Sequence, residues 1–293
     1  MNPSDPANLD AELSVVWFTA LVLACVPVAL VVLWRAARLY LSGRAFPLPD
    51  GGAMPAVRWP AWFGLLLFGG MYAVMYAVVA AYALLEEAGL LPWGPPDVGE
   101  MFQPYVFAAQ AIPPALGLAV VAVGFGRGAA ATVGVRWGRL AAGVGSALVA
   151  LAAVLPMCVA GFYVNVAVLD VVGLEAAQHP LLTDVVREPS AWTMGLALLQ
   201  AGVLAAVSEE FMYRGVLLAS LLRAVGPARA IGLTSALFAL MHATTEPQAV
   251  LPLFLLGLAM GYVAYRRRSL VAPIVVHGLF NTLMVVGAVS AGP

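Results

Sequence analysis

Eight long apolar segments recur along this chain, and their length limits what it can fold into. A helix that crosses about 30 Å of hydrocarbon needs about 20 apolar residues. The segments that reach or approach this length are 13–34, 61–85, 104–126, 140–165, 191–222, 230–245, 249–265 and 270–290. They predict an all-α fold, a polytopic integral membrane bundle of about eight transmembrane helices. The sixth segment is short, which indicates a water-filled recess or a re-entrant turn near Pro247.

The scarcity of charged residues indicates which solvent surrounds the chain. Only 10% of the residues are charged, whereas soluble domains carry about 25%. Lipid must therefore be the solvent for most of the exterior. Every basic residue is an arginine and alanine is abundant, which is typical of a GC-rich bacterial genome. We therefore expect an integral protein of the bacterial inner membrane, with the lipid bilayer as a partner and no nucleic acid.

The arginines predict how the bundle is oriented. Cytoplasmic loops of membrane proteins carry an excess of basic residues. With the N-terminus outside, successive inside loops hold Arg35, Arg38, Arg44, Arg58, Arg127, Arg136, Arg139, Arg223, Arg229, Arg266, Arg267 and Arg268. The alternation predicts an even number of spans, with both termini on the non-cytoplasmic side.

The two parts of the chain differ in what their apolar segments contain. Residues 1–190 hold no ionisable group within a predicted span, so we expect four N-terminal helices that act as a scaffold or a substrate-facing wall. His179 precedes a proline in an outside loop, where a solvated side chain is expected. The predicted four-helix functional domain is 191–293. Within it, Gly257-x-x-x-Gly261 predicts a helix-packing seam.

Ionisable and amide side chains interrupt the apolar segments of this second part. Inside a membrane they cost about 2.5–3.5 kcal/mol each on insertion scales, so they are expected to meet one another or water. They are Glu209, Glu210 and Arg214 in the fifth segment, His242 in the sixth, and His277 and Asn281 in the eighth. Counted from the inner-face arginines at about 1.5 Å per residue, Glu209, His242 and Asn281 all lie about 20 Å deep. One layer of the membrane can therefore hold the whole set.

Helical spacing predicts which of these side chains share a face. Glu210 and Arg214 are four residues apart and are expected to form an intramembrane ion pair. Glu209 is rotated by about 100° from Glu210, so it is free to face other groups. His277 and Asn281 also share a face. Glu209, His242, His277 and Asn281 are therefore predicted to converge from three helices.

Such a set suits hydrolysis by water. A carboxylate and a neutral imidazole can hold and deprotonate a water molecule as a general base. A second imidazole and an amide can donate hydrogen bonds to a developing oxyanion. These are the parts of a peptide-bond hydrolase without a serine or cysteine nucleophile. Alternatively, Glu209, His242 and His277 could bind zinc, with water as the fourth ligand. No cofactor is certain from these residues.

Two other functions use the same residues. The polar groups could link helices, as single buried polar residues often do. They could also form a proton or ion path, because transporters hold carboxylates and histidines at mid-membrane.

Three short motifs carry a resemblance to a known family. Glu209-Glu210-x-x-x-Arg214-Gly215, Phe238-x-x-x-His242 and His277-x-x-x-Asn281 resemble the signature motifs of the CPBP (Abi) family. This family of CAAX proteases and bacteriocin-processing enzymes includes the type II CAAX prenyl endopeptidases. The similarity covers about 190–290.

The resemblance implies an intramembrane endopeptidase with an eight-helix core. It assigns water activation to Glu209 and His242, and the oxyanion hole to His277 and Asn281. The family is labelled as metalloproteases, and a metal-free glutamate mechanism is also proposed for it. The implied substrate is a membrane-associated or lipidated protein or peptide. Bacterial members are also linked to self-immunity, and some act as non-catalytic membrane partners.

Overall fold

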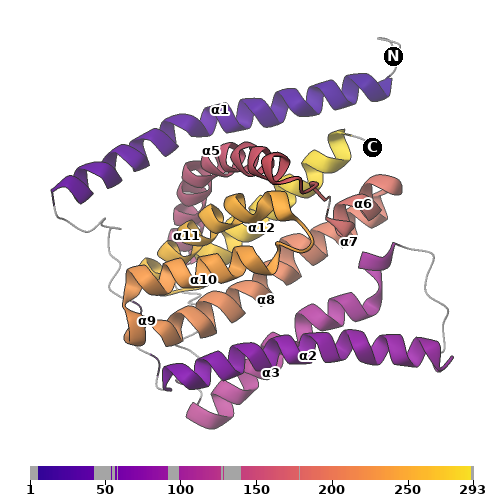
Figure 1. Cartoon of the computed structure of the whole chain (residues 1–293), viewed down its shortest axis with the longest axis vertical. Coiled ribbons are helices and arrows are strands. Elements are labelled where there is room, and N and C mark those ends of the chain that lie inside the picture. The colour runs from indigo at the N-terminus through magenta and orange to yellow at the C-terminus, as the bar shows by residue number, and fades with distance from the viewer. Residues whose placement is uncertain are drawn as a thin grey trace.

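A computed structural model describes residues 6–42, 54, 57, 59–91, 99–126, 128, 140–177 and 179–291. In this part of the chain all regular structure is helical, as predicted (Figure 1). The helices before residue 190 are α1 (Pro6–Leu41), α2 (Ala61–Glu87), η1 (Glu100–Phe102), α3 (Pro104–Phe125), α5 (Leu140–Val172) and α6 (Pro180–Arg187). The later helices are α7 (Ala191–Ala197), η3 (Leu198–Ala205), α8 (Ala206–Glu210), η4 (Phe211–Leu218), α9 (Ala219–Val225), α10 (Pro227–Met241), η5 (Pro247–Ala249), α11 (Val250–Arg267) and α12 (Val271–Ala291).

Seven helical stretches in the described residues are long and apolar enough to cross a membrane. The chain is therefore an all-α integral membrane protein. The remaining predicted span, the sixth segment, is α10, which has 15 residues and spans only about 22 Å. It stops at Met241 rather than at residue 245, because the N–H groups of His242 and Ala243 bond at 3.1 Å to carbonyls only three residues back, which ends the regular pattern of the helix. His242 therefore caps α10 and does not lie within it, contrary to the sequence prediction.

The fifth predicted span is one helical run, residues 191–225, built from five consecutive elements. A capping box between Ser190 and Thr193 starts it. It ends at Gly226, whose φ of 78° suits glycine, and Pro227 then opens α10. Two segments of the run, η3 and η4, are π-helical. The short α8 between them carries Glu209 and Glu210 at its end, and such π insertions frequently mark functional sites.

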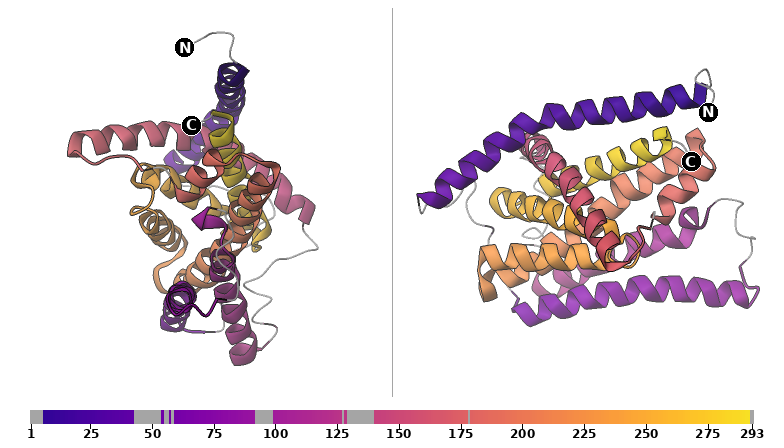
Figure 2. Two further views of the ribbon diagram at one scale, coloured as in Figure 1. Left: turned by 90° about the vertical axis from the view of Figure 1, so that its right-hand side faces the viewer. Right: turned by 45° about the horizontal axis from the view of Figure 1, so that its top comes forward.

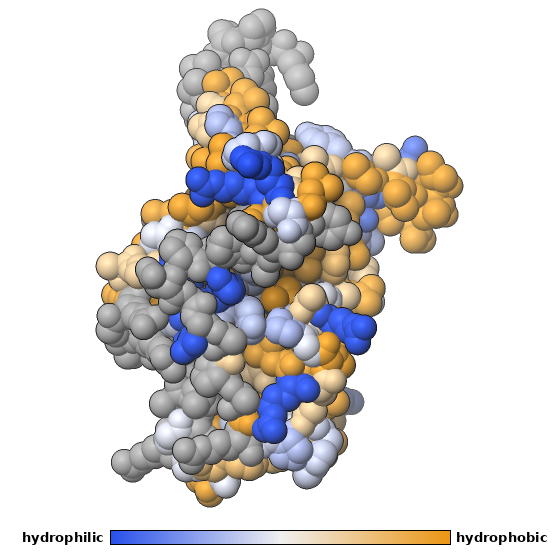
Figure 3. Space-filling view, turned by 90° about the vertical axis from the view of Figure 1, so that its left-hand side faces the viewer, coloured by the Kyte–Doolittle hydropathy of each residue, from blue (hydrophilic) through white to orange (hydrophobic). Residues whose placement is uncertain are grey.

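The helices surround a buried centre (Figures 1 and 2). The α1 helix runs along one edge against α5 and α12, and α2 pairs with α3 at the opposite edge. The long 191–225 run, α10, α11 and α12 lie between these edges. The start of α1 and the end of α12 lie toward the same end of the molecule. At the other end, hydrophilic side chains lie in several groups among apolar ones (Figure 3).

Membrane sidedness stays a prediction from the arginines. Arg44, Arg58, Arg127, Arg136 and Arg139 contribute to that prediction and lie outside the described residues.

Glycines allow the central helices to approach closely. A Cβ on Gly257 would lie 2.9 Å from Cβ of Ser235, and one on Gly261 would lie 3.0 Å from Cγ2 of Ile231. The predicted Gly257-x-x-x-Gly261 seam is therefore confirmed, with α10 as the partner of α11. A Cβ on Gly278 would overlap the carbonyl oxygen of Gly202. This contact brings α12 against η3, about two turns before the two glutamates.

Candidate active site

An ion pair is buried at the centre of the bundle. Nη1 of Arg214 lies 2.7 Å from Oε1 of Glu210, and both side chains are fully buried. Nη2 of Arg214 donates to the carbonyl oxygen of Gly257 at 3.3 Å, and the guanidinium lies 4.9 Å from the centre of the Phe238 ring. The predicted Glu210–Arg214 pair is thus confirmed. Gly257 and Phe238 supply additional partners of the kind that a buried charge requires, whereas Nε of Arg214 and Oε2 of Glu210 have no hydrogen-bond partner among the described residues.

His277 lies between the two glutamates. Its Nδ1 is 3.0 Å from Oε1 of Glu210, and its Nε2 is 3.9 Å from Oε2 of Glu209. The first distance is a hydrogen bond, in which Nδ1 donates to the carboxylate paired with Arg214. The second is too long for one and leaves room for a water molecule. Oε2 of Glu209 is buried and has no hydrogen-bond partner among the described residues.

The backbone orients His242. Its Nδ1 lies 2.8 Å from the carbonyl oxygen of Phe238. A carbonyl only accepts hydrogen bonds, so Nδ1 carries the proton and Nε2 of the neutral ring keeps a free lone pair. The Phe238 ring contacts the rings of both His242 and His277, with centroids 5.0 and 5.6 Å away. A backbone carbonyl and one fully buried phenylalanine thereby hold His242 in place.

Asn281 lies one turn after His277 and connects α12 to the π-helical segment. Its Nδ2 donates to the carbonyl oxygen of Ala201 at 2.9 Å. The amide keeps a second N–H and its oxygen for other partners.

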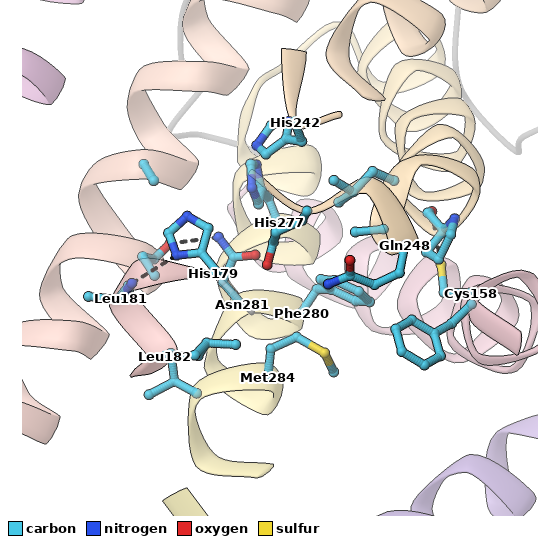
Figure 4. A pocket seen from close by; sticks show the side chains of 18 of the residues that line it. Cys158, His179, Leu181, Leu182, His242, Gln248, His277, Phe280, Asn281 and Met284 are labelled. Atoms are coloured by element: carbon cyan, nitrogen blue, oxygen red, sulfur yellow. Dashed lines mark hydrogen bonds between the residues drawn. The ribbon is translucent and has the colours of Figure 1, made fainter. Parts of the chain in front are cut away.

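A cavity of about 470 Å³ joins these residues. Glu209, His242, His277 and Asn281 all line it, and Figure 4 shows the two histidine rings and the asparagine amide along it. A second cavity of about 160 Å³, which is lined also by Tyr72, shares Glu209 and His242 with the first. The structure therefore brings the four predicted residues together around one space, with the Glu210–Arg214 pair buried behind them.

The sequence prediction missed polar residues of this cavity. They are Gln110, Gln200, Glu246, Gln248 and His179. Gln110 and Gln200 each have a buried side-chain oxygen without a hydrogen-bond partner among the described residues. Neutral amides within apolar helices give no charge signal, which explains why the pattern did not single them out.

The expectation that His179 is solvated was wrong. His179 caps α6, its Nδ1 accepts a hydrogen bond from the Leu181 N–H at 3.1 Å, and its ring lines the cavity. Burial lowers the pKa of His179 to about 4, and the electrostatic interaction with His242 adds to this shift. A signal was available in the sequence: the chain has three histidines, and all three line this cavity.

The predicted zinc ligands are Glu209, His242 and His277. Among the described residues, no three histidine, cysteine, aspartate or glutamate side chains are grouped so that they could hold one metal ion. Nδ1 of His277 is bonded to Glu210, and its Nε2 lies 3.9 Å from the nearest Glu209 oxygen. Zinc ligands lie about 2.0–2.2 Å from the ion, so two ligands of one ion lie closer to one another than these two atoms do. As they stand, these donors do not fit a zinc ion.

The comparisons with known proteins agree with the location of this site. Residues 191–283, about a third of the chain, match the family model described as type II CAAX prenyl endopeptidase Rce1-like. No curated protein and no solved structure gave a match. The matched region includes Glu209, His242, His277 and Asn281, whereas His179 and the helices before it lie outside.

Proposed function

We propose that this chain is an intramembrane endopeptidase, which hydrolyses a peptide bond of a membrane-associated or lipidated protein or peptide. The observation that carries the proposal is the convergence of Glu209, His242, His277 and Asn281 on one cavity. The match of residues 191–283 to a CAAX endopeptidase family supports the same class of reaction.

Glu209 is the proposed general base. Its side chain is 27% exposed, and its buried Oε2 is free to accept a hydrogen bond from water in the cavity. The free Nε2 of His242 accepts a second hydrogen bond and orients that water. As the water oxygen bonds to the substrate carbonyl carbon, Glu209 takes a proton. The C–N bond then breaks, and Glu209 returns the proton to the departing amine nitrogen.

His277 and Asn281 are the proposed oxyanion donors. The second N–H of Asn281 is available because only one is needed for the Ala201 carbonyl. His277 can donate from Nε2 when both ring nitrogens carry protons. Donors aimed at a developing negative charge typically contribute 10²–10³-fold to the rate.

Two glutamines favour a peptide as the occupant of the cavity. The side-chain oxygens of Gln110 and Gln200 are buried acceptors without partners among the described residues. An extended peptide presents backbone N–H groups that would satisfy such acceptors, and leaving them unsatisfied is costly. The rest of the lining is mostly apolar and includes Leu155, Phe162 and Phe280, which suits a substrate that arrives from the lipid phase.

The test is cleavage of a peptide library by the purified protein in lipid nanodiscs. We expect products with the wild type and none with Glu209→Gln, which keeps the shape of the side chain and removes the base. Asn281→Ala should lower kcat by about 10²–10³-fold. A transporter would instead show ion-coupled flux in liposomes, and flux without any peptide product would overturn the proposal.

A further inference from the structure

His179 reaches the cavity from a segment outside the region that matches the family. It precedes α6, and its Nδ1 accepts the backbone N–H of Leu181. An acceptor Nδ1 carries no proton, so the neutral ring carries its proton on Nε2. No hydrogen bond of Nε2 to another described residue is present. The ring therefore offers one N–H donor to the space that it lines (Figure 4).

Gln248 holds the segment that leads to His179. Its Oε1 accepts the N–H of Ala177 at 3.0 Å, and its Nε2 donates to the carbonyl oxygen of the same residue at 2.6 Å. Two bonds to one residue fix both the position and the rotation of the backbone there. Asn165 in turn holds η5, the element that contains Gln248, because its Nδ2 donates to the Pro247 carbonyl at 2.6 Å. Two amide side chains thus position His179 beside the His242 turn.

The environment keeps this donor neutral. The lowered pKa of His179 means that the ring is uncharged near neutral pH. A neutral N–H can approach a peptide carbonyl without the cost of desolvating a charge. At the neighbouring groups, Asn281 uses one N–H on Ala201 and His277 uses Nδ1 on Glu210, so each keeps only one donor for the substrate.

We propose that His179 is a further substrate-binding residue of this site, which donates from Nε2 to the carbonyl oxygen of the bound peptide. The proposal rests on the proposed endopeptidase function. It assigns to the segment before residue 190 one named contact with the substrate, where the sequence predicted a scaffold or a substrate-facing wall without naming a residue.

Variants at position 179 can separate this contact from helix capping. His179→Asn and His179→Ser keep an oxygen that can cap α6, but neither side chain extends as far as Nε2. His179→Gln has the opposite combination of properties. Its amide nitrogen extends about as far as Nε2 of the histidine, but glutamine is a poor cap for α6. The assay uses a peptide selected from the library with the wild type, and measures kcat, KM and the thermal midpoint of each variant in nanodiscs.

We expect His179→Asn and His179→Ser to keep the wild-type midpoint and to lose about 10²-fold in kcat/KM, because a buried substrate carbonyl then lacks its donor. His179→Gln should recover most of that activity in spite of a lower midpoint. Wild-type kcat/KM in either capping variant, or activities that simply follow the midpoints, would overturn the proposal. Failure of the endopeptidase function would look different, because the wild type would then cleave no more than Glu209→Gln, and the role of His179 would fall with it.

Discussion

Nδ1 of His277 lies 3.0 Å from Oε1 of Glu210, the same oxygen that binds Arg214. One carboxylate oxygen therefore neutralises a buried guanidinium and orients a histidine from another helix. This shared oxygen links the stability of the bundle to the geometry of the site, and it distinguishes Glu210 from the neighbouring Glu209.

Removal of Glu210 should lower the stability of the folded protein. Glu210→Ala leaves Arg214 as an uncompensated charge at a fully buried position, which typically costs about 3–5 kcal/mol of unfolding free energy. The thermal midpoint in nanodiscs measures this loss, with Glu209→Gln as the control because Glu209 has no ion pair with any arginine that the structure describes. A Glu210→Ala protein that is as stable as the wild type but inactive would require the roles of the two glutamates to be exchanged.

A methyl group on Gly278 should displace α12. The Cβ of Gly278→Ala would meet the backbone oxygen of Gly202, which cannot move as a side chain can. Such overpacking typically costs about 1–3 kcal/mol. It would also shift His277 and Asn281, so activity and thermal stability should both fall. Gly287→Ala is the control in the same helix, because no described atom beyond the nearby backbone of α12 itself lies within 4 Å of its Cβ, and it should leave both quantities nearly unchanged.

His179 should make stability depend on pH in a defined window. Its pKa is lowered to about 4 in the folded protein, so the unfolded chain binds this proton more readily between about pH 6.5 and pH 4. Stability should therefore fall as the pH drops through that window. Burial raises the pKa of Glu246, which contributes with the opposite sign. The comparison of wild type with His179→Asn removes that common contribution, and parallel pH dependences of the two midpoints would contradict the prediction.

The proposed endopeptidase activity should not need a bound transition metal. Because the donors of Glu209, His242 and His277 do not converge as a zinc set, we expect chelators to leave kcat unchanged. Elemental analysis of the purified protein should show far less than one zinc per chain. Activity that is lost to a chelator and restored by zinc would instead establish the zinc hypothesis for these three residues.

Both termini should lie outside the cytoplasm. The prediction rests on the arginine-rich loops, since basic residues are retained on the cytoplasmic side. Reporter fusions after Arg44, Arg139 and Arg268 should be cytoplasmic, and fusions after Gly89 and Asp184 should be external. One robust reversal would mean that the number of crossings is wrong, with the 15-residue α10 as the first candidate.

The sequence by itself determined the features that depend on local helical geometry. Apolar length predicted the membrane helices, and a spacing of four residues predicted the Glu210–Arg214 pair, because neighbouring turns of one helix fix that distance. It also singled out Glu209, His242, His277 and Asn281, because polar groups at membrane depth need partners.

Only the tertiary structure decided which groups from separate segments meet. It placed His277 between the two glutamates and ended α10 before His242. It also brought His179 to the cavity, because Gln248 forms hydrogen bonds with Ala177. These relationships join residues that are up to 71 positions apart along the chain. Helical periodicity carries no information over such separations, because they depend on how whole helices pack and on where the backbone leaves the helix.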